Sequence, residues 1–282
     1  MYSLNRAQII GHTTEDPVVR ELDSGAIVAD LNLEIKSKVQ LENNETQFRT
    51  TFLTVTLWQK LAEIVRDYVK KGHQLYLTGR LETDSWEDDN GIKKYKTKMV
   101  ADNLIMLSPK DGFLPDLDEN LDITGGINVV EVIGNLTKTP ELKTTPNGNN
   151  VTSFGVATNR VWKDSNGEKQ EKTEFHNIVI WDSLAEVVSK NIPKGRKVYI
   201  RGRLQTRSWE TPEGQKRYTT EIIATEVKSL GHGLKNSMST ESNSSSENKK
   251  ESSTSSEKVA EAVNDIPEIN YESDIKPEDL PF

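Results

Sequence analysis

The segment FLTVTLWQKLAEIVRDYVKKGHQLYLTG, from Phe52 to Gly79, encodes three structural elements in a row. Its first seven residues alternate between apolar and polar side chains and its last six are mainly apolar, which is typical of two β-strands. Between these ends, apolar residues recur at helical spacing at Leu61, Ile64, Val65 and Tyr68. Gly72 then closes the pattern, so the segment predicts a strand, a short amphipathic helix over 60–71 and a second strand.

The same segment returns 123 residues later, and one offset relates many positions on both sides of it. The matched pairs include Gly11 with Gly134, Pro17 with Pro140, Phe52 with Phe175, Trp58 with Trp181, Leu61-Ala62-Glu63 with Leu184-Ala185-Glu186, Gly79-Arg80-Leu81 with Gly202-Arg203-Leu204, and Ser85-Trp86 with Ser208-Trp209. This period is far longer than a solenoid repeat, so the repeating unit is a whole domain and the chain is a tandem duplication.

Further strands are predicted outward from this segment, at residues 7–11, 28–35 and 93–106, and the second unit repeats them. The order is strand, strand, strand, helix, strand, strand, which is the layout of the OB-fold, a small five-stranded Greek-key barrel. We therefore predict an all-β protein of two tandem OB-folds followed by a disordered acidic tail. SH3-like and other small barrels remain the alternative fold at this level. Layout alone also leaves the ligand open, because a fold does not imply a function.

The charge is distributed unevenly along the chain, whose formal net charge is -8. The predicted first domain, residues 1–108, has a net charge of -2 and the acidic linker, residues 109–126, has -4. The second domain, residues 127–231, is basic at +4, and residues 232–282 contribute -6. Within the last segment, 232–264 is a disordered tether rich in Ser, Asn and Glu, and 265–282 is an acidic tail that carries apolar residues.

Composition excludes several classes of protein. The chain has no cysteine, which rules out disulfides, thiolate zinc sites, iron–sulfur clusters and a cysteine nucleophile. Its four histidines lack metal-ligand spacing, and no catalytic triad, P-loop or dinucleotide motif is present, so we expect no metal, no cofactor and no enzymatic activity. No apolar stretch approaches the length of a membrane span, and the first residues do not form a secretory signal, so we expect a cytoplasmic protein without a membrane partner.

Several motifs of the second unit resemble the bacterial single-stranded-DNA-binding protein family. They are Asn128-Val-Val-Glu-Val-Ile-Gly-Asn-Leu, Thr173-Glu-Phe-His-Asn-Ile-Val-Ile-Trp, Val198-Tyr-Ile-Arg-Gly-Arg-Leu and Arg207-Ser-Trp-Glu. The chain also ends in Pro277-Glu-Asp-Leu-Pro-Phe, similar to the acidic terminus of that family. Two domains in one chain resemble the Deinococcus-Thermus type, in which a homodimer presents four OB-folds. The resemblance thus implies a homodimer that binds single-stranded DNA.

The resemblance also assigns base-stacking positions, which are Trp162, Phe175, Trp181 and Trp209 in the second unit and Phe52, Trp58 and Trp86 in the first. Stacking on flat side chains suits a binder that ignores sequence, because every base has a stacking face. The first unit departs from the motif, with Leu53 at the position of His176 and Val39 at that of Trp162. Acidic residues also flank Trp86, so we expect the second unit to dominate DNA affinity.

Basic residues interleave with the aromatic ones in the second unit and are candidate phosphate contacts. They are Arg160, Lys163, Arg201, Arg203, Arg207, Lys216 and Arg217. The alternative for each is an ordinary solvated surface charge, and salt dependence of binding would decide between the two. For Tyr76, Tyr199 and Phe154, which lie in strongly apolar segments, we favour the barrel core over a DNA contact. His176 is expected to be structural or interfacial.

The C-terminal tip is formed by Glu278, Asp279, Leu280, Pro281 and Phe282. One interpretation is a solubilising acidic tail. The favoured one is a recognition peptide whose terminal Phe and free carboxylate enter a basic pocket on a partner protein. The resemblance implies that these partners are replication, recombination and repair enzymes.

The sequence therefore predicts a protein that coats single-stranded DNA and recruits genome-maintenance enzymes through its tail. Two rival functions remain. One is an interaction protein whose OB-folds mainly bind other proteins, and the other is an OB-fold nuclease. Single-stranded RNA also remains possible as a ligand, because stacking and phosphate contacts do not identify the sugar.

Overall fold

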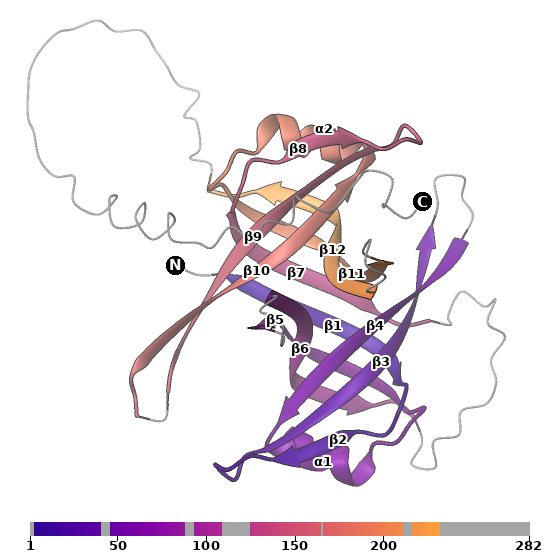
Figure 1. Ribbon diagram of the computed structural model, residues 1–282, viewed down its shortest axis with the longest axis vertical. Coiled ribbons are helices and arrows are strands. Elements are labelled where there is room, and N and C mark those ends of the chain that lie inside the picture. Colours follow the sequence, from indigo (N-terminus) through magenta and orange to yellow (C-terminus); the bar gives the residue numbers. More distant parts are fainter. Residues whose placement is uncertain are drawn as a thin grey trace, which may run out of the picture. The chain divides into compact units, whose positions relative to one another are not determined.

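The computed structural model describes residues 3–40, 46–87, 93–108, 125–164, 166–210 and 216–231 (Figure 1). The elements of the first unit are β1 (Leu4–Thr13), β2 (Val18–Glu21), β3 (Ile27–Gln40), β4 (Thr46–Trp58), α1 (Lys60–Tyr68), β5 (Gln74–Glu87) and β6 (Lys93–Met106). Those of the second unit are β7 (Asn128–Leu136), β8 (Glu141–Thr144), β9 (Asn150–Lys163), β10 (Lys169–Trp181), α2 (Asp182–Asn191), β11 (Lys197–Glu210) and β12 (Lys216–Ser229). The predicted tandem OB-fold is confirmed.

Each unit has one short strand more than the five predicted. β2 pairs with the outer edge of β3, and β8 pairs in the same way with β9. Pro17 and Pro140 stand between the first and second strands of each unit, where the absence of a backbone N–H interrupts a continuous ladder. The first strand of each barrel is therefore split in two, a break that the sequence pattern alone did not reveal.

The backbone repeats the duplication in detail. In each unit, the residue directly after the third long strand, Gln59 or Asp182, has a positive φ, of 52° and 57° respectively. The strand after the helix shifts register at a glycine, Gly79 in β5 and Gly202 in β11. A Cβ at either glycine would lie 2.2 Å from a backbone carbonyl oxygen of the neighbouring strand, so only glycine fits this close approach.

The apolar core follows strand alternation in both barrels. Leu75 and Leu77 are fully buried on β5, and Phe154 is buried on β9 as predicted. Tyr76 and Tyr199 were predicted to lie in the core as well, but that prediction is wrong. Both are only partly buried, and the Tyr199 hydroxyl donates a hydrogen bond of 2.7 Å to Glu131 Oε1. Side chains on a strand alternate between its faces, so tyrosines next to core residues point away from the core.

The two units share one sheet. β1 and β7 pair antiparallel, from Leu4 opposite Ile133 to Ile9 opposite Asn128, and this pairing joins the strands of both barrels (Figure 1). Beside this seam, Asn128 donates to Leu204 O at 2.9 Å and accepts from Leu204 N at 2.8 Å. Asn5 makes the same pair of bonds to Leu81 in the first unit. These matched bonds satisfy backbone groups at the register shift of each barrel.

The remaining predicted segments lie mostly outside the described residues. Of the predicted linker, only Gly125 and Gly126 are described, and Gly126 N donates to Lys36 O at 2.6 Å. The predicted tether and acidic tail, which include the tip residues Glu278 to Phe282, are among the residues that the structure does not describe.

Candidate nucleic-acid interface

Two long hairpin arms carry much of the candidate interface. One is formed by β3 and β4, and the other by β9 and β10 (Figure 1). On the first arm, Phe52 and Phe48 are 59% and 44% exposed, and Phe48 stands directly opposite Lys38. Exposing a large aromatic ring to water is unfavourable unless a ligand covers it, so this arm offers a stacking surface next to cations.

The sequence repeat does not point to Phe48, Lys36 and Lys38 on this arm. At the offset of 123 these residues correspond to Glu171, Asn159 and Val161, which are neither aromatic nor basic. Alternation of exposed residues along 34–38 and 48–52 was the signal that could have found them.

The aromatic residues predicted to stack are accessible wherever their side chains are described. Trp58 and Trp86 are 43% and 46% exposed, while Phe175, Trp162 and Trp181 are partly buried. Trp209 lies on β11 opposite Arg217, but its side chain is outside the described part of the structure. None of the described members of the stacking set belongs to the apolar core.

Trp162 lies under a cation. The guanidinium carbon of Arg160 is 4.5 Å from the Trp162 ring centroid, a cation–π contact. Strand alternation places these two side chains on the opposite face of the arm from Phe175. The structure thus brings together two of the predicted residues but separates them from a third on the same arm.

Acidic residues around Trp86 are balanced across the hairpin. On β5, Asp84 and Glu87 precede and follow the tryptophan, but the facing strand β6 places Lys96 and Lys93 opposite them in the register. Lys98 forms an ion pair of 2.5 Å with Asp84. The local potential at Trp86 is therefore less negative than its flanking sequence indicates, which weakens the reason for expecting the second unit to dominate.

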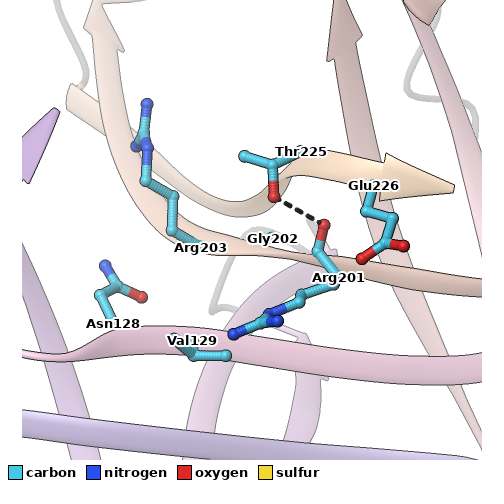
Figure 2. Close-up of a pocket in the computed structure, with 7 residues that line it drawn as sticks. All are labelled: Asn128, Val129, Arg201, Gly202, Arg203, Thr225 and Glu226. Atoms are coloured by element: carbon cyan, nitrogen blue, oxygen red, sulfur yellow. Dashed lines mark hydrogen bonds between the residues drawn. The ribbon is translucent and has the colours of Figure 1, made fainter. Parts of the chain in front are cut away.

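The predicted phosphate-binding residues have different environments. Lys163 and Arg201 are exposed, and Arg203 is partly buried with its Nη1 donating to Gln205 Oε1 at 2.9 Å. Arg201 and Arg203 line a surface pocket of about 500 Å³ next to Asn128 (Figure 2). The side chains of Lys216 and Arg217 lie outside the described residues.

Arg207 does not have the environment expected of a phosphate contact. Only 9% of the residue is exposed, and its guanidinium bonds to Glu221, with Nη2 and Nε each 3.3 Å from Oε1. Burial raises the pKa of Glu221, and the charge of Arg207 opposes that shift. An arginine engaged in a buried ion pair is a structural cation, so we omit Arg207 from the proposed contacts.

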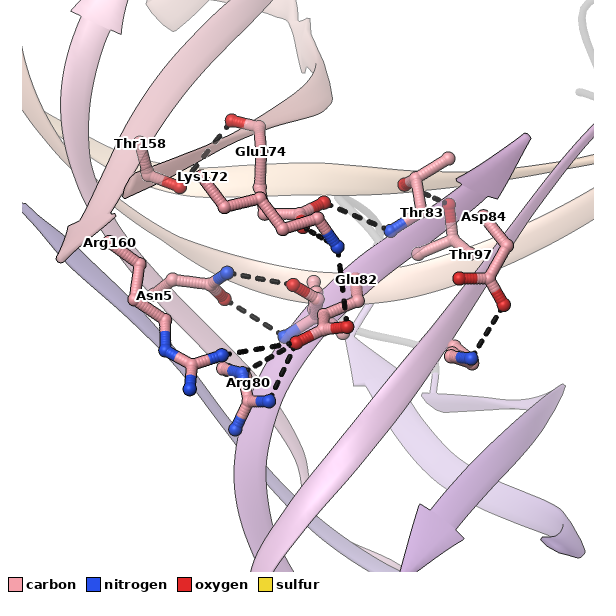
Figure 3. A network of polar contacts seen from close by, with 12 residues as sticks. Asn5, Arg80, Glu82, Thr83, Asp84, Thr97, Thr158, Arg160, Lys172 and Glu174 are labelled. Atoms are coloured by element: carbon pink, nitrogen blue, oxygen red, sulfur yellow. Dashed lines mark hydrogen bonds and ion pairs between the residues drawn. The ribbon is translucent and has the colours of Figure 1, made fainter. Parts of the chain in front are cut away.

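Glu82 organises a dense polar network where β5 of the first unit meets the second arm (Figure 3). Its carboxylate accepts from Arg80 Nε at 2.7 Å, from Arg160 Nη1 at 3.4 Å and from Lys172 Nζ at 3.5 Å. Lys172 also lies 2.6 Å from Glu174 Oε1. Burial alone would raise the pKa of Glu82, but Arg80 and Lys172 together hold that pKa below its usual value.

His176 is buried and uncharged. Its Nε2 lies 2.9 Å from Thr158 Oγ1, and burial lowers the pKa of His176 to about 4. Among the described residues, no three acidic or histidine side chains are grouped to hold a metal ion. Within the same residues, no helix is long and apolar enough to cross a membrane.

Two OB-folds whose arms expose aromatic rings beside cations define a tandem oligonucleotide- or oligosaccharide-binding protein. The sequence profile of the Single-strand binding protein family matches residues 4–107 and 127–230, and the chain belongs to this family.

Individual relatives match this chain across both of its domains. The chain is 30% identical to the "Single-stranded DNA-binding protein" of Deinococcus radiodurans over 237 residues, which cover 84% of this chain and 78% of the relative. It is 31% identical to that of Thermus aquaticus over 225 residues, which cover 78% and 82% respectively. The crystal structure of the wild-type Thermus aquaticus protein matches with a TM-score of 0.64 at 27% identity, covering 83% of this chain and 96% of that one.

Proposed function

We propose that this protein binds single-stranded DNA without sequence preference, through base stacking and phosphate neutralisation. The observation that carries the proposal is the set of exposed aromatic side chains on both units, Phe52, Trp58 and Trp86 above all, beside lysine and arginine residues. Each stacked base contributes about 1–3 kcal/mol, and basic residues along the groove attract the backbone of any sequence. The names of the relatives from Deinococcus radiodurans and Thermus aquaticus support the same ligand.

A fluorescence titration tests the proposal directly, because all five tryptophans of the chain belong to the proposed stacking set. We expect a long oligo-dT to quench the intrinsic fluorescence strongly at low salt and to saturate at a fixed nucleotide-to-protein ratio. Absence of quenching at low salt would contradict stacking and would favour a protein whose OB-folds mainly bind other proteins. The same titration with oligo-U separates a DNA-binding from an RNA-binding protein.

We further propose that the protein coats single strands in the cytoplasm, at the nucleoid, and shields them during replication, recombination and repair. Binding alone accounts for this role, without chemistry. Prolonged incubation of a labelled oligonucleotide with the protein and Mg²⁺ should leave the oligonucleotide intact, whereas shortened products would favour the nuclease alternative.

The C-terminal tip from Glu278 to Phe282 is proposed to recruit genome-maintenance enzymes. An apolar terminus with a free carboxylate, preceded by acids, suits insertion into a basic pocket. We expect the chain without Leu280 to Phe282 to bind oligo-dT as the intact chain does but to lose recruitment of replication and repair enzymes. Unchanged recruitment would leave the tail with a solubilising role only.

A homodimer that presents four OB-folds is also proposed. One supporting feature is the face of β5, β1, β7 and β11 that points away from both cores. Tyr76 on this face stands opposite Ile10 and Ile105, and Ile105 is 48% exposed. Tyr199 stands opposite Ile133 in the second unit. A partly apolar sheet face of this kind suits burial against a second copy.

A further inference from the structure

The two units meet at two equivalent junctions. At each junction, the hairpin arm of one unit lies against the strand that follows the helix in the other unit, which is β5 in the first unit and β11 in the second. The first junction is the network around Glu82 described above, with Arg80, Arg160, Lys172 and Glu174. The second is formed by the residues 123 positions away in the sequence, which are Arg203, Gln205, Ser37, Arg49 and Thr51.

The second junction joins the equivalent strands, β4 and β11, but lacks the acids of the first. Thr51 Oγ1 donates to Leu204 O at 3.3 Å, and Thr206 Oγ1 donates to Phe52 O at 3.1 Å, so β4 and β11 are held together. Gln205 replaces Glu82, and Thr51 replaces Glu174. Both carboxylates of the first junction are thus exchanged for neutral side chains.

Two guanidinium groups converge on Gln205. Its Oε1 accepts from Arg203 Nη1 at 2.9 Å and from Arg49 Nη1 at 3.5 Å. No carboxylate among the described residues forms an ion pair with either arginine, although both are partly buried. A neutral amide oxygen cannot neutralise two positive charges, and like charges at close range destabilise each other.

The electrostatics of Arg203 also indicate a site without a counter-ion. Burial, followed by the charge of Arg49, lowers the pKa of Arg203 to about 10, the direction expected for a cation that lacks a counter-ion. Arg203 lines the pocket of about 500 Å³ that also contains Arg201 (Figure 2). The single acid in that pocket, Glu226, lies 3.4 Å from Lys228 Nζ and is already paired. The acid of the pocket is therefore not available to neutralise Arg203.

We propose that Arg49 and Arg203 bind a backbone phosphate of the single strand where it passes between the two units. The inference rests on the proposed DNA binding and adds a crossing point, which is the place where the strand passes from one unit to the other. β4 also carries Phe52, on the opposite face of the arm from Arg49, and β11 continues to Trp209, so strands of both proposed stacking sets meet at this junction. At the first junction the equivalent cations are occupied by Glu82 and Glu174, so a phosphate is not expected there.

The structure supplies a matched pair of variants. Gln205→Glu gives the second junction the carboxylate of the first, and Glu82→Gln removes that carboxylate from the first. Gln205→Glu should form ion pairs with Arg49 and Arg203, and we expect it to raise Tm by about 2–4 °C. A variant that is more stable but binds DNA less well cannot owe its weaker binding to misfolding.

Binding is measured by tryptophan quenching with an oligo-dT of about 30 nucleotides, long enough for both units, and one of about 8, within the range of a single OB-fold. For a single strand, each phosphate contact adds about 0.7 to the steepness with which log affinity falls as log salt concentration rises, which is called the salt slope here. For the long oligonucleotide, affinity falls by some factor when salt rises from 50 to 200 mM. That factor should be about 2.6 times smaller for Gln205→Glu than for the wild type. For the short one, the two proteins should behave alike.

Glu82→Gln should change the salt slope in the opposite direction, because it frees Arg80 and Arg160 to meet the strand. An unchanged slope in Gln205→Glu, in a wild type that does bind oligo-dT, would overturn the crossing point while leaving the proposed function intact.

Inorganic phosphate tests the anion site independently of DNA. It should raise the Tm of the wild type more than sodium chloride of equal ionic strength does, and this excess should disappear in Gln205→Glu. Equal responses of the two proteins would contradict the site. If the wild type fails to bind oligo-dT, the proposed function fails, but the phosphate measurement still decides whether the two arginines form an anion site.

Discussion

At the scale of single residues, the second barrel contains a polar pair where the first has an apolar one. Thr158 and His176 occupy the positions of Ile35 and Leu53, and all four side chains are buried. The pair costs little at neutral pH because each partner satisfies the other, with Thr158 Oγ1 2.9 Å from His176 Nε2. In acid the cost becomes larger, because a buried imidazolium is strongly disfavoured.

This pair predicts a specific acid sensitivity. The pKa of His176 is about 4 in the folded state, below the usual 6.5 of an unfolded chain, so between these values the unfolded state binds more protons. Stability therefore falls as pH drops through this window, by about 3 kcal/mol in total from this group. Thr158→Ile with His176→Leu, which copies the first barrel, should remove this loss and change stability at pH 7 by less than about 1 kcal/mol.

Denaturant unfolding of the wild type and the double variant, from about pH 7 to pH 4, measures the difference directly. Because all other titrating groups are shared, they cancel in the comparison. Parallel pH profiles of the two proteins would show that His176 does not titrate as its burial requires.

At the scale of elements, the hairpin of β5 and β6 changes what is expected of Trp86. From sequence alone, its acidic neighbours favoured weak DNA binding by the first unit. We now expect the first unit to contribute more to DNA binding, because lysines of β6 face Trp86 and its neighbours and because Phe48 and Lys38 are exposed on the first arm. Trp86→Ala and Trp209→Ala should therefore each weaken oligo-dT binding, by about 1–3 kcal/mol and to a similar extent.

Equilibrium titrations of both variants at the same salt concentration check this expectation. Tyr68→Ala on α1 is the matched control, because that aromatic residue is 52% exposed but lies outside the proposed stacking set, and its loss should leave affinity unchanged. A loss confined to Trp209→Ala would restore the original expectation that the second unit dominates.

These elements also show which features sequence can predict. The offset of 123 predicted the two barrels, the helix between their strands and the aromatic positions that both units share, but not Phe48 or Trp162, each of which is present in one unit only. It could not give features that depend on register across strands, such as the ion pair of Arg207 with Glu221 or the lysines that face Asp84. Strand alternation was visible in the sequence, and applied to Tyr76 between Leu75 and Leu77 it would have placed that tyrosine outside the core.

At the scale of the whole molecule, the pairing of β1 with β7 joins both units in one sheet face, on which Tyr76 and Tyr199 are partly buried. A charged residue at its centre should prevent association, because burying an unpaired carboxylate against an apolar partner is strongly unfavourable. We expect the wild type to sediment at twice the 31.8 kDa of one chain and Tyr76→Glu to sediment as a monomer. Val187→Glu adds the same charge at a site that is 57% exposed on α2, away from this face, and should remain a dimer. A dimer that survives Tyr76→Glu would require a different interface, since Tyr76 lies between Ile10 and Ile105 on adjacent strands.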